Sequence, residues 1–451
     1  MSNQDFEEYE RDQQLLEQRR LKRLELKRKR KIQQRITLAV LAVVLILVIV
    51  LIAKGCSADP KEKEPQLPEE PIVPVEPDPT PDPDVTATLA AVGDIMMYDS
   101  QIQAGQLSET EYDFSSCFEA IKPYTISTDL TVGNLELNFC GYAPYGGNPQ
   151  AQPYFNCPEV LASNLSDIGF DVLQTANTYS IMSGIQGLQS TINFLNQAGI
   201  DHVGTHATDP AQSGSGGVVL REVNGITFAI IGYTKGVNNM RLPANNQYSV
   251  DLLYTDYDSE YRQVDTTSIL NRVDAAKKTN ADVIIAMVHW GSEYDVTVSE
   301  TQYEIRDLLF KNGVDVILGS HSHIVGPMEM VEVETTEGEK KDCFVAYSLG
   351  NFISNMTKQY TQESVILNLE FTKDGQSGKT TISKAEYTPL YILDRGEGAE
   401  KRYEVLPIRS ASQSDMFNEY EAVMSAAIEN IQKNSTPVKE GAIAANHDSG
   451  K

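Results

Sequence analysis

Short runs of valine, isoleucine and leucine recur along the chain after Thr86, and they predict β-strands. Eight runs stand out, at 88–92, 130–137, 170–173, 226–231, 282–288, 314–318, 344–347 and 365–369. Apolar residues at helical spacing between some of them predict helices over 185–198, 266–278 and 301–311. Strands that alternate with helices are typical of an α/β fold with buried sheets. The late strands follow one another without helices, so we expect part of one sheet to be antiparallel.

A longer apolar run has a different character. Ile36–Ala53 is almost purely aliphatic and carries no charge over its 18 residues. A helix of this length spans about 27 Å, which is enough for the hydrocarbon core of a bilayer. A cleaved secretory signal is the main alternative, but some 35 residues precede the run, and signal peptides have shorter leaders. We therefore predict a single uncleaved transmembrane helix at 36–53.

The charges beside this helix predict its orientation. Residues 27–31 are all Lys or Arg and Arg35 follows, whereas Lys54 is the one basic residue directly after the helix. Cytoplasmic flanks carry such an excess of basic residues. We expect residues 1–35 to be a cytoplasmic basic segment and the C-terminal part to be extracellular. The predicted location is the plasma membrane, with a single pass.

Composition divides the rest of the chain. Residues 54–85 contain nine prolines among acidic residues, which predicts an extended linker with a reach of up to about 100 Å. The predicted folded domain covers residues 86–400. In the remainder, 401–451, an amphipathic pattern predicts a helix over 414–433, and the polar residues after it are expected to be disordered.

Charge and cysteine content narrow the function classes. The net charge is −26, although residues 1–35 hold eleven Lys and Arg against seven Asp and Glu, so the acidic excess lies after them. An acidic domain repels nucleic acid, which we exclude as a partner. Five cysteines show no CxxC pair. Cys140 and Cys157 form a disulfide in one interpretation, and in the other the cysteines are free or buried thiols.

Polar residues interrupt or directly follow the ends of several predicted strands. They are Asp94, Asn134, Glu136, Asn177, His289, His321, His323 and Asn351. In α/β sheets, ligands bind beyond the carboxyl ends of the strands. We therefore expect these side chains to converge on one site.

Histidine supplies the strongest chemical signal in this set. The chain has six histidines, and three of them, His289, His321 and His323, follow two predicted strands. Alternation along an extended segment would direct His321 and His323 to the same side. Imidazoles with carboxylates suit Zn²⁺, Mn²⁺ or Fe²⁺. In the alternative interpretation each histidine is a hydrogen-bonded core or loop residue, which is what we expect of His202 and His206.

Seven sequence blocks carry a family resemblance. They are AAVGDIM (90–96), DLTVGNLE (129–136), GFDVLQTAN (169–177), GIDHVGTH (199–206), VHWGSEY (288–294), GSHSH (319–323) and YSLGNF (347–352). In this order they resemble the CapA-like family of poly-gamma-glutamate capsule synthesis. The resemblance implies a metallophosphatase-like, four-layer αββα sandwich. It also implies a role in making, anchoring or releasing an extracellular polymer.

The resemblance also assigns roles to residues. It implies that the metal-binding set is Asp94, Glu136, His289, His321 and His323, and that Asn134 and Asn351 line the pocket. The implied cofactor is one or two divalent ions, of manganese, zinc or iron. In such sites the metals activate water and bind the reacting phosphate or carbonyl group.

One block departs from the family pattern, which usually reads Ala-Asn-Asn-His. Here Ala176 and Asn177 are followed by Thr178, where a metal-binding Asn is expected, and Tyr179, where the catalytic His is expected. Tyrosine, with a pKa near 10, is a weaker general acid at neutral pH than histidine. Tyr179 and Asn177 are the candidate catalytic residues, and Thr178 is expected to line the pocket.

Two hypotheses follow. In the first, the chain is a metal-dependent, phosphoesterase-like hydrolase that acts on a cell-envelope polymer. In the second, it is a catalytically degenerate protein that binds the polymer or serves as a scaffold. Both have the plasma membrane and a membrane-bound synthesis complex as partners.

Overall fold

The computed structural model describes residues 82–150, 152, 154–398, 402–408, 420–435 and 445–446. All of them belong to one compact unit, residues 79–451. The predicted cytoplasmic segment, the predicted membrane helix and most of the predicted linker and tail lie outside the described residues. No helix in the described ranges has the length and apolar character needed to cross a bilayer.

The larger of two sheets has nine strands in the described residues. Their order is β14 (Tyr403–Pro407), β13 (Thr380–Asp394), β12 (Glu363–Lys373), β1 (Val85–Ile95), β2 (Leu130–Leu135), β3 (Val172–Gln174) and β4 (Asp201–Val203), with β11 (Asn351–Ile353) on β1 and β15 (Ala445–Asn446) on β13. Strands β1 to β4 and β11 run parallel. Strands β12, β13 and β14 pair antiparallel, which confirms the expectation for the late strands.

The smaller sheet has six strands in the same part of the chain. Their order is β5 (Val219–Val223), β6 (Ile226–Thr234), β7 (Val283–His289), β8 (Val316–Ser320), β10 (Lys340–Ala346) and β9 (Met328–Glu334). Its four central strands are parallel, and β5 and β9 are antiparallel edges. The parallel strands read as near-continuous apolar runs because both of their faces are buried.

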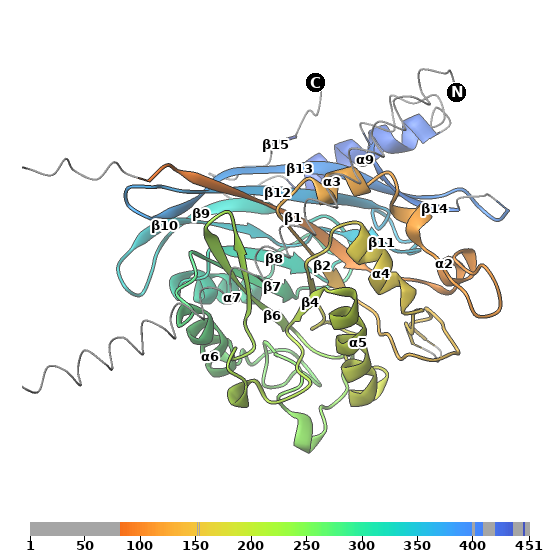
Figure 1. Cartoon of the computed structure of the whole chain (residues 1–451), viewed down its shortest axis with the longest axis horizontal. Coiled ribbons are helices and arrows are strands. Elements are labelled where there is room, and N and C mark those ends of the chain that lie inside the picture. The colour runs from red at the N-terminus through yellow and green to blue at the C-terminus, as the bar shows by residue number, and fades with distance from the viewer. Residues whose placement is uncertain are drawn as a thin grey trace, which may run out of the picture. The chain divides into compact units, whose positions relative to one another are not determined.

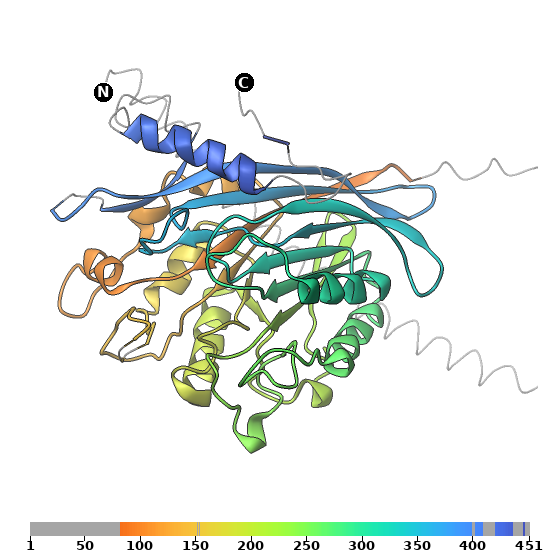
Figure 2. The ribbon, with the colours of Figure 1, turned by 180° about the vertical axis from the view of Figure 1, so that it is seen from behind.

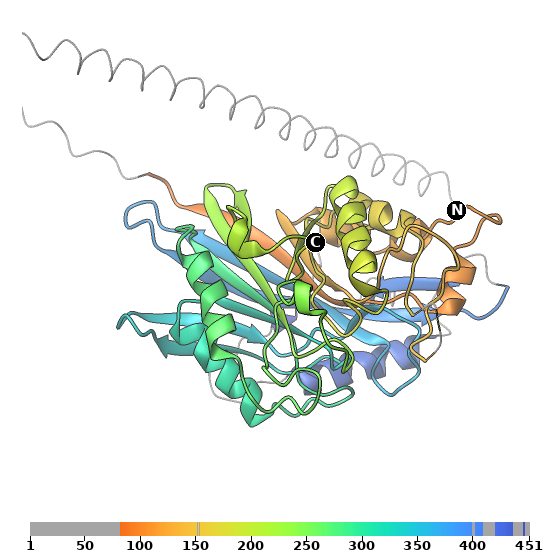
Figure 3. The same cartoon turned by 90° about the horizontal axis from the view of Figure 1, so that it is seen from below.

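The two sheets pack face to face, and helices cover their outer faces. Leu89 and Ala91 of β1 join a core with Phe228 and Ile285 of the other sheet. The alternate residues of β1 instead face α4 (Val160–Asp167) and α5 (Gly184–Ala198). Helices α6 (Thr266–Lys277) and α7 (Glu300–Lys311) pack on β6, β7 and β8. Figures 1 and 3 show these helix pairs on opposite sides of the strands. The α/β prediction is confirmed.

The remaining elements connect or extend these layers. They are α2 (Asp99–Ala104), η1 (Ser115–Phe118), α3 (Lys122–Ile126), η2 (Pro210–Gln212), η3 (Ala244–Asn246) and α9 (Glu421–Asn434). Helix α9, blue in Figure 2, lies along β12 and β13 and buries Met424, Ala427 and Ile431. Its end agrees closely with that of the helix predicted at 414–433, while residues 409–419 lie outside the described ranges. The sheet continues past residue 400 through β14.

The cysteines in the described ranges are free. Cys117, Cys157 and Cys343 are buried, and Cys140 is half-buried. Burial raises the pKa of each of these four thiols, as expected for small apolar core residues rather than reactive thiolates.

Candidate metal centre

The first part of the site comes from neighbouring strands of the larger sheet. Asp94 near the end of β1 is in register with Asn134 on β2 and Asn351 on β11. A Cβ on Gly93 would lie 1.8 Å from Gly350 O, so only glycine allows β1 this close to the chain that enters β11. Asn134 Nδ2 donates to Asp94 Oδ1 at 2.7 Å. The register therefore places and orients the Asp94 carboxylate.

Glu136 and His289 connect the two sheets. Glu136 directly follows β2, and its backbone N–H donates to Ile95 O. His289 ends β7 of the opposite sheet, with Nδ1 3.3 Å from Thr234 Oγ1. His289 Nε2 lies 3.1 Å from Glu136 Oε1, and both side chains are fully buried. The pair brings the carboxyl ends of β2 and β7 together.

His321 and His323 come together in a way that differs from the prediction. We expected an extended segment, but both residues lie in a turn after β8 and have positive φ angles of 96° and 60°. Such angles are rare for residues with a side chain and are found at functional sites. The ring centroids lie 6.0 Å apart. The turn, rather than strand alternation, therefore brings the imidazoles together.

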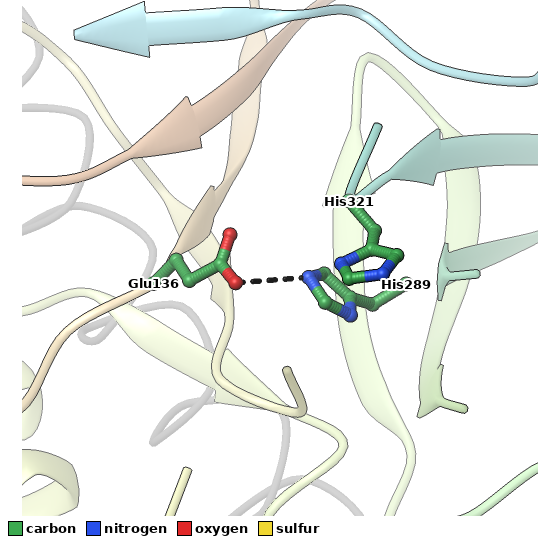
Figure 4. A group of neighbouring side chains, drawn as sticks. All are labelled: Glu136, His289 and His321. Carbon is green, nitrogen blue, oxygen red and sulfur yellow. Dashed lines mark hydrogen bonds and ion pairs between the residues drawn. The ribbon is translucent and has the colours of Figure 1, made fainter. Parts of the chain in front are cut away.

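These side chains form a set that could hold a cation. Candidate ligand atoms of Glu136, His289 and His321 lie within 4.8 Å of one another, as do those of Asp94, Glu136 and His323. Figure 4 shows the Glu136 carboxylate directed at His289, with the His321 ring beside it. The five residues that the sequence nominated as ligands are thus brought into one buried cluster.

Two atoms in this cluster lack hydrogen-bond partners. Glu136 Oε2 and His321 Nδ1 are buried, and neither bonds to any atom of the described residues. A buried polar atom without a partner is costly and needs a reason. A carboxylate oxygen and an imidazole nitrogen are ligands that a borderline divalent ion accepts. The donor set therefore fits a divalent metal.

Charges inside the cluster are strongly coupled. Burial would lower the pKa of His323, but its ion pair with Asp94 Oδ2 at 3.0 Å raises that pKa to about 9. Burial would raise the pKa of Asp94, and the same pair, with His289 and Asn134, holds it below its ordinary value. Burial, with the charges of His289 and Lys235, lowers the pKa of His321 well below its usual range. A neutral His321 is the form that binds a metal.

The block that departs from the family pattern, residues 176–179, lies beside this cluster. Asn177 Nδ2 donates to Leu135 O at 2.7 Å and to Asn134 Oδ1 at 3.1 Å, and its Oδ1 accepts from the Tyr179 backbone N–H. Asn177 therefore acts on Asp94 through Asn134. Thr178 is half-buried. Burial, with the charges of Glu136 and other nearby acids, raises the pKa of Tyr179 far above its ordinary value. The Tyr179 hydroxyl thus stays protonated at neutral pH.

The pocket asparagine Asn351 contacts a candidate ligand directly. Its Oδ1 lies 3.1 Å from His323 Nδ1, and its Nδ2 donates to Thr361 O at 3.0 Å. Because Nδ1 of His323 faces Asn351 and Asp94, its Nε2 is the ring atom left for a ligand. Such partners orient a metal-binding imidazole.

Sequence reasoning missed Glu293 and Lys235. Glu293 lies in the block 288–294 and groups with His321 and His323 within 4.8 Å. Lys235 directly follows β6, and its Nζ donates to Gly291 O at 2.7 Å. Both follow strand ends, so the rule that identified His289 would have found them if applied to every polar type.

Comparison with known proteins gives the family. A family model described as bacterial capsule synthesis protein PGA_cap matches residues 88–356. The chain belongs to this family. The matched range contains every candidate ligand of the metal centre, from Asp94 on β1 to His323 after β8.

Named relatives of this PGA_cap chain include two CapA proteins. The PGA biosynthesis protein CapA of Bacillus subtilis is 25% identical over 304 residues, which are 67% of this chain and 70% of that protein. The capsule biosynthesis protein CapA of Bacillus anthracis is 24% identical over 298 residues, 64% of each chain. A solved phosphatase structure from Mycoplasma pneumoniae is similar with a TM-score of 0.36 and 11% identity, and covers 68% of this chain and 94% of that one.

Proposed function

We propose that this chain acts in capsule synthesis as a metal-dependent hydrolase or transferase on a cell-envelope polymer. The observation that carries the proposal is the pair of unpartnered buried atoms, Glu136 Oε2 and His321 Nδ1, inside a cluster of carboxylates and imidazoles. The capsule-synthesis family supplies the biological context. The relatives' names support a polymer of the PGA type as the substrate.

The residues of the centre have distinct parts in this proposal. Glu136, His289 and His321 would hold a divalent ion of manganese, zinc or iron, and Asp94 with His323 would complete the site. When bound, such an ion activates water and polarises a carbonyl or phosphoryl oxygen. Asn134 and Asn177 fix the orientation of Asp94 through their hydrogen bonds. Tyr179, held protonated, donates a hydrogen bond to the substrate.

The location belongs to the same proposal. The apolar run 36–53 and the basic residues before it support an anchor in the plasma membrane with the folded domain outside. A membrane-bound synthesis complex would then be the natural partner. Protease added to intact cells should degrade the folded domain and leave the N-terminal segment protected. Equal protection of both parts would overturn this placement.

Metal analysis tests the centre. Purified protein dialysed against Mn²⁺ or Zn²⁺ should retain at least about one equivalent, which matches one cluster. The double variant His321→Ala/His323→Ala should lose the bound ion, while Lys340→Ala, an exposed site on β10, should keep it. Hydrolysis of a phosphodiester or of poly-gamma-glutamate that persists in the double variant would contradict a catalytic role for this centre.

A second candidate function is polymer binding without catalysis. It is favoured by Thr178 and by Tyr179, whose raised pKa makes it a poor proton donor in a reaction. The double variant Thr178→Asn/Tyr179→His restores the family pattern. If turnover rises at least about 100-fold while metal content is unchanged, the native chain is a binding protein. Measurable turnover by the native protein that does not rise in the double variant favours the enzyme.

A further inference from the structure

Lysine and tyrosine side chains gather around the metal centre. This lysine–tyrosine rim consists of Tyr98, Tyr179, Tyr294, Lys235 and Lys358. Tyr294 lies with its ring 6.1 Å from that of His323, and Lys358 Nζ is 5.8 Å from the centroid of the Tyr294 ring. Tyr98 and Tyr179 both pack against Phe155, at 5.2 and 4.5 Å between ring centroids.

Lys235 is held at the edge of the centre by its own contacts. Its backbone N–H donates to His289 O at 2.8 Å, and its Nζ donates to Gly291 O at 2.7 Å. The ammonium also lies 4.7 Å from the centroid of the Tyr261 ring. Since an ammonium has three N–H groups and one is used among the described residues, two remain for a ligand. Lys235 is therefore positioned but not saturated.

The tyrosine hydroxyls are donors in this setting. Burial, with repulsion from Glu136 and Glu293, raises the pKa of Tyr98 and of Tyr179, so both stay protonated. Among the described residues neither hydroxyl forms a hydrogen bond, and both side chains are half-buried. Tyr294 is 39% exposed. The rim therefore offers aromatic rings with hydroxyl groups beside the centre.

The charge balance indicates what these donors bind. The chain as a whole is strongly acidic, with a net charge of −26, yet the rim contains two ammonium groups, those of Lys235 and Lys358. The domain as a whole would repel an anionic oxygen of a substrate, whereas Lys235 and Lys358 would attract it at the rim. Preorganised N–H and O–H donors beside a metal are also the arrangement that stabilises an oxyanion.

We propose that the lysine–tyrosine rim is the subsite for an anionic oxygen group of the substrate, a carboxylate or a phosphate, with Lys235 as its main charged contact. The proposal rests on the proposed function, since it places the substrate at the metal centre. Lys235 and the Tyr98 hydroxyl bind the anionic group. Lys358, exposed over Tyr294, adds charge at the entrance.

Anion binding tests the rim. Purified full-length protein, metal-free and loaded with Mn²⁺, is titrated calorimetrically with inorganic phosphate and with glutarate at low ionic strength. Lys235→Gln should weaken binding about tenfold or more, because one charge-assisted hydrogen bond is lost. Tyr98→Phe should weaken it about threefold to tenfold. The anion that binds more tightly to the native protein identifies the chemical group.

Control variants separate this proposal from the metal centre. Lys340→Gln removes an exposed charge at the start of β10 and should change affinity by less than about twofold. Metal content must be unchanged in Lys235→Gln. Anion binding that depends on Lys235, in a protein that retains no divalent metal after dialysis against Mn²⁺ or Zn²⁺, would support the rim and contradict the metal-based function. Metal binding with no anion affinity, or with affinity indifferent to Lys235→Gln, overturns the rim.

Discussion

Two clusters in the described residues join histidine to carboxylate, and they differ in how fully their polar atoms are partnered. In the first, His206 Nε2 lies 2.9 Å from Asp251 Oδ2, and Arg272 Nε donates to the same oxygen at 3.0 Å. Arg272 also contacts Asp251 Oδ1 and Gly216 O. Burial would raise the pKa of Asp251, but His206 and Arg272 hold it below its ordinary value. Its charge is neutralised within the fold.

The metal centre has the same kinds of residue and a different balance. Asp94 pairs with His323, Glu136 pairs with His289, and Glu293 lies near His321 and His323. Among the described residues, no arginine forms a hydrogen bond with these three carboxylates. Glu136 Oε2 and His321 Nδ1 have no hydrogen-bond partner in the part of the chain that the structure describes. A structural cluster satisfies its own atoms, whereas a binding site reserves some of them for a ligand. The contrast therefore separates the framework histidine from the functional ones.

The largest expected effect concerns the satisfied cluster. Arg272→Met should destabilise the protein by about 3–5 kcal/mol, because it leaves the buried Asp251 carboxylate poorly paired. Urea unfolding of the purified protein measures this change. Arg262→Met, which removes an exposed pair with Glu260, should cost at most about 1 kcal/mol. Metal content should be unchanged in Arg272→Met, and a loss of metal would break the contrast between the clusters.

A smaller effect is expected at the open edge of the metal centre. Glu293→Gln should weaken divalent-metal binding about tenfold, since it removes one carboxylate and leaves the buried ligands in place. Competition with a chelator measures the affinity. Glu300→Gln, at the exposed start of α7, is the matched control. Equal affinities in both variants would place Glu293 outside the site.

The smallest effect concerns a buried carboxylate whose partner, within the described ranges, is an amide and not a cation. Asn430 of α9 donates to Glu363 Oε1 at 2.8 Å, and burial raises the pKa of Glu363 from 4.5 to about 7. A raised pKa means that the folded state binds the proton more tightly. Stability from this group is therefore present below pH 4.5 and is lost as pH rises to about 7.

Glu363→Gln keeps the acceptor and cannot ionise, so it isolates this titration. Thermal unfolding should show that the stability of the variant increases relative to that of the native protein as pH rises from 4.5 to 7. The gain should level off above that range. A difference between the two proteins that does not change with pH would show that Glu363 titrates normally in the folded state.

The sequence predicted much of the architecture, because strong local patterns decide it. The helices at 266–278 and 301–311 were found within a residue or two of α6 and α7. Helix α7 begins at a capping box of Ser299 and Gln302, a local signal. Short or polar edge strands such as β4, β5 and β9 were missed. Their pairing depends on distant strands, and their own sequences carry little periodicity.

The site was predicted in part for a related reason. Asp94, His289 and His323 follow buried strands, and the parallel arrangement gathers such ends at one edge. The prediction of how His321 and His323 come together was wrong, because both residues have positive φ angles in a turn and do not form the expected extended segment. A turn of this kind is stabilised by contacts from elsewhere in the fold. Glu293 and Lys235 were missed because single polar residues in loops are common.

By itself, the sequence determined the α/β layering, the family and the residue types of the metal centre. Strand patterns and the residues at strand ends can be recognised from short stretches of sequence. Only the tertiary structure decided which polar atoms are satisfied. His206 and His321 are the same residue type, yet Asp251 and Arg272 both contact Nε2 of His206. Nδ1 of His321 is buried and has no hydrogen-bond partner among the described residues. Hydrogen-bond partners across hundreds of residues are fixed by sheet packing, which no local pattern encodes.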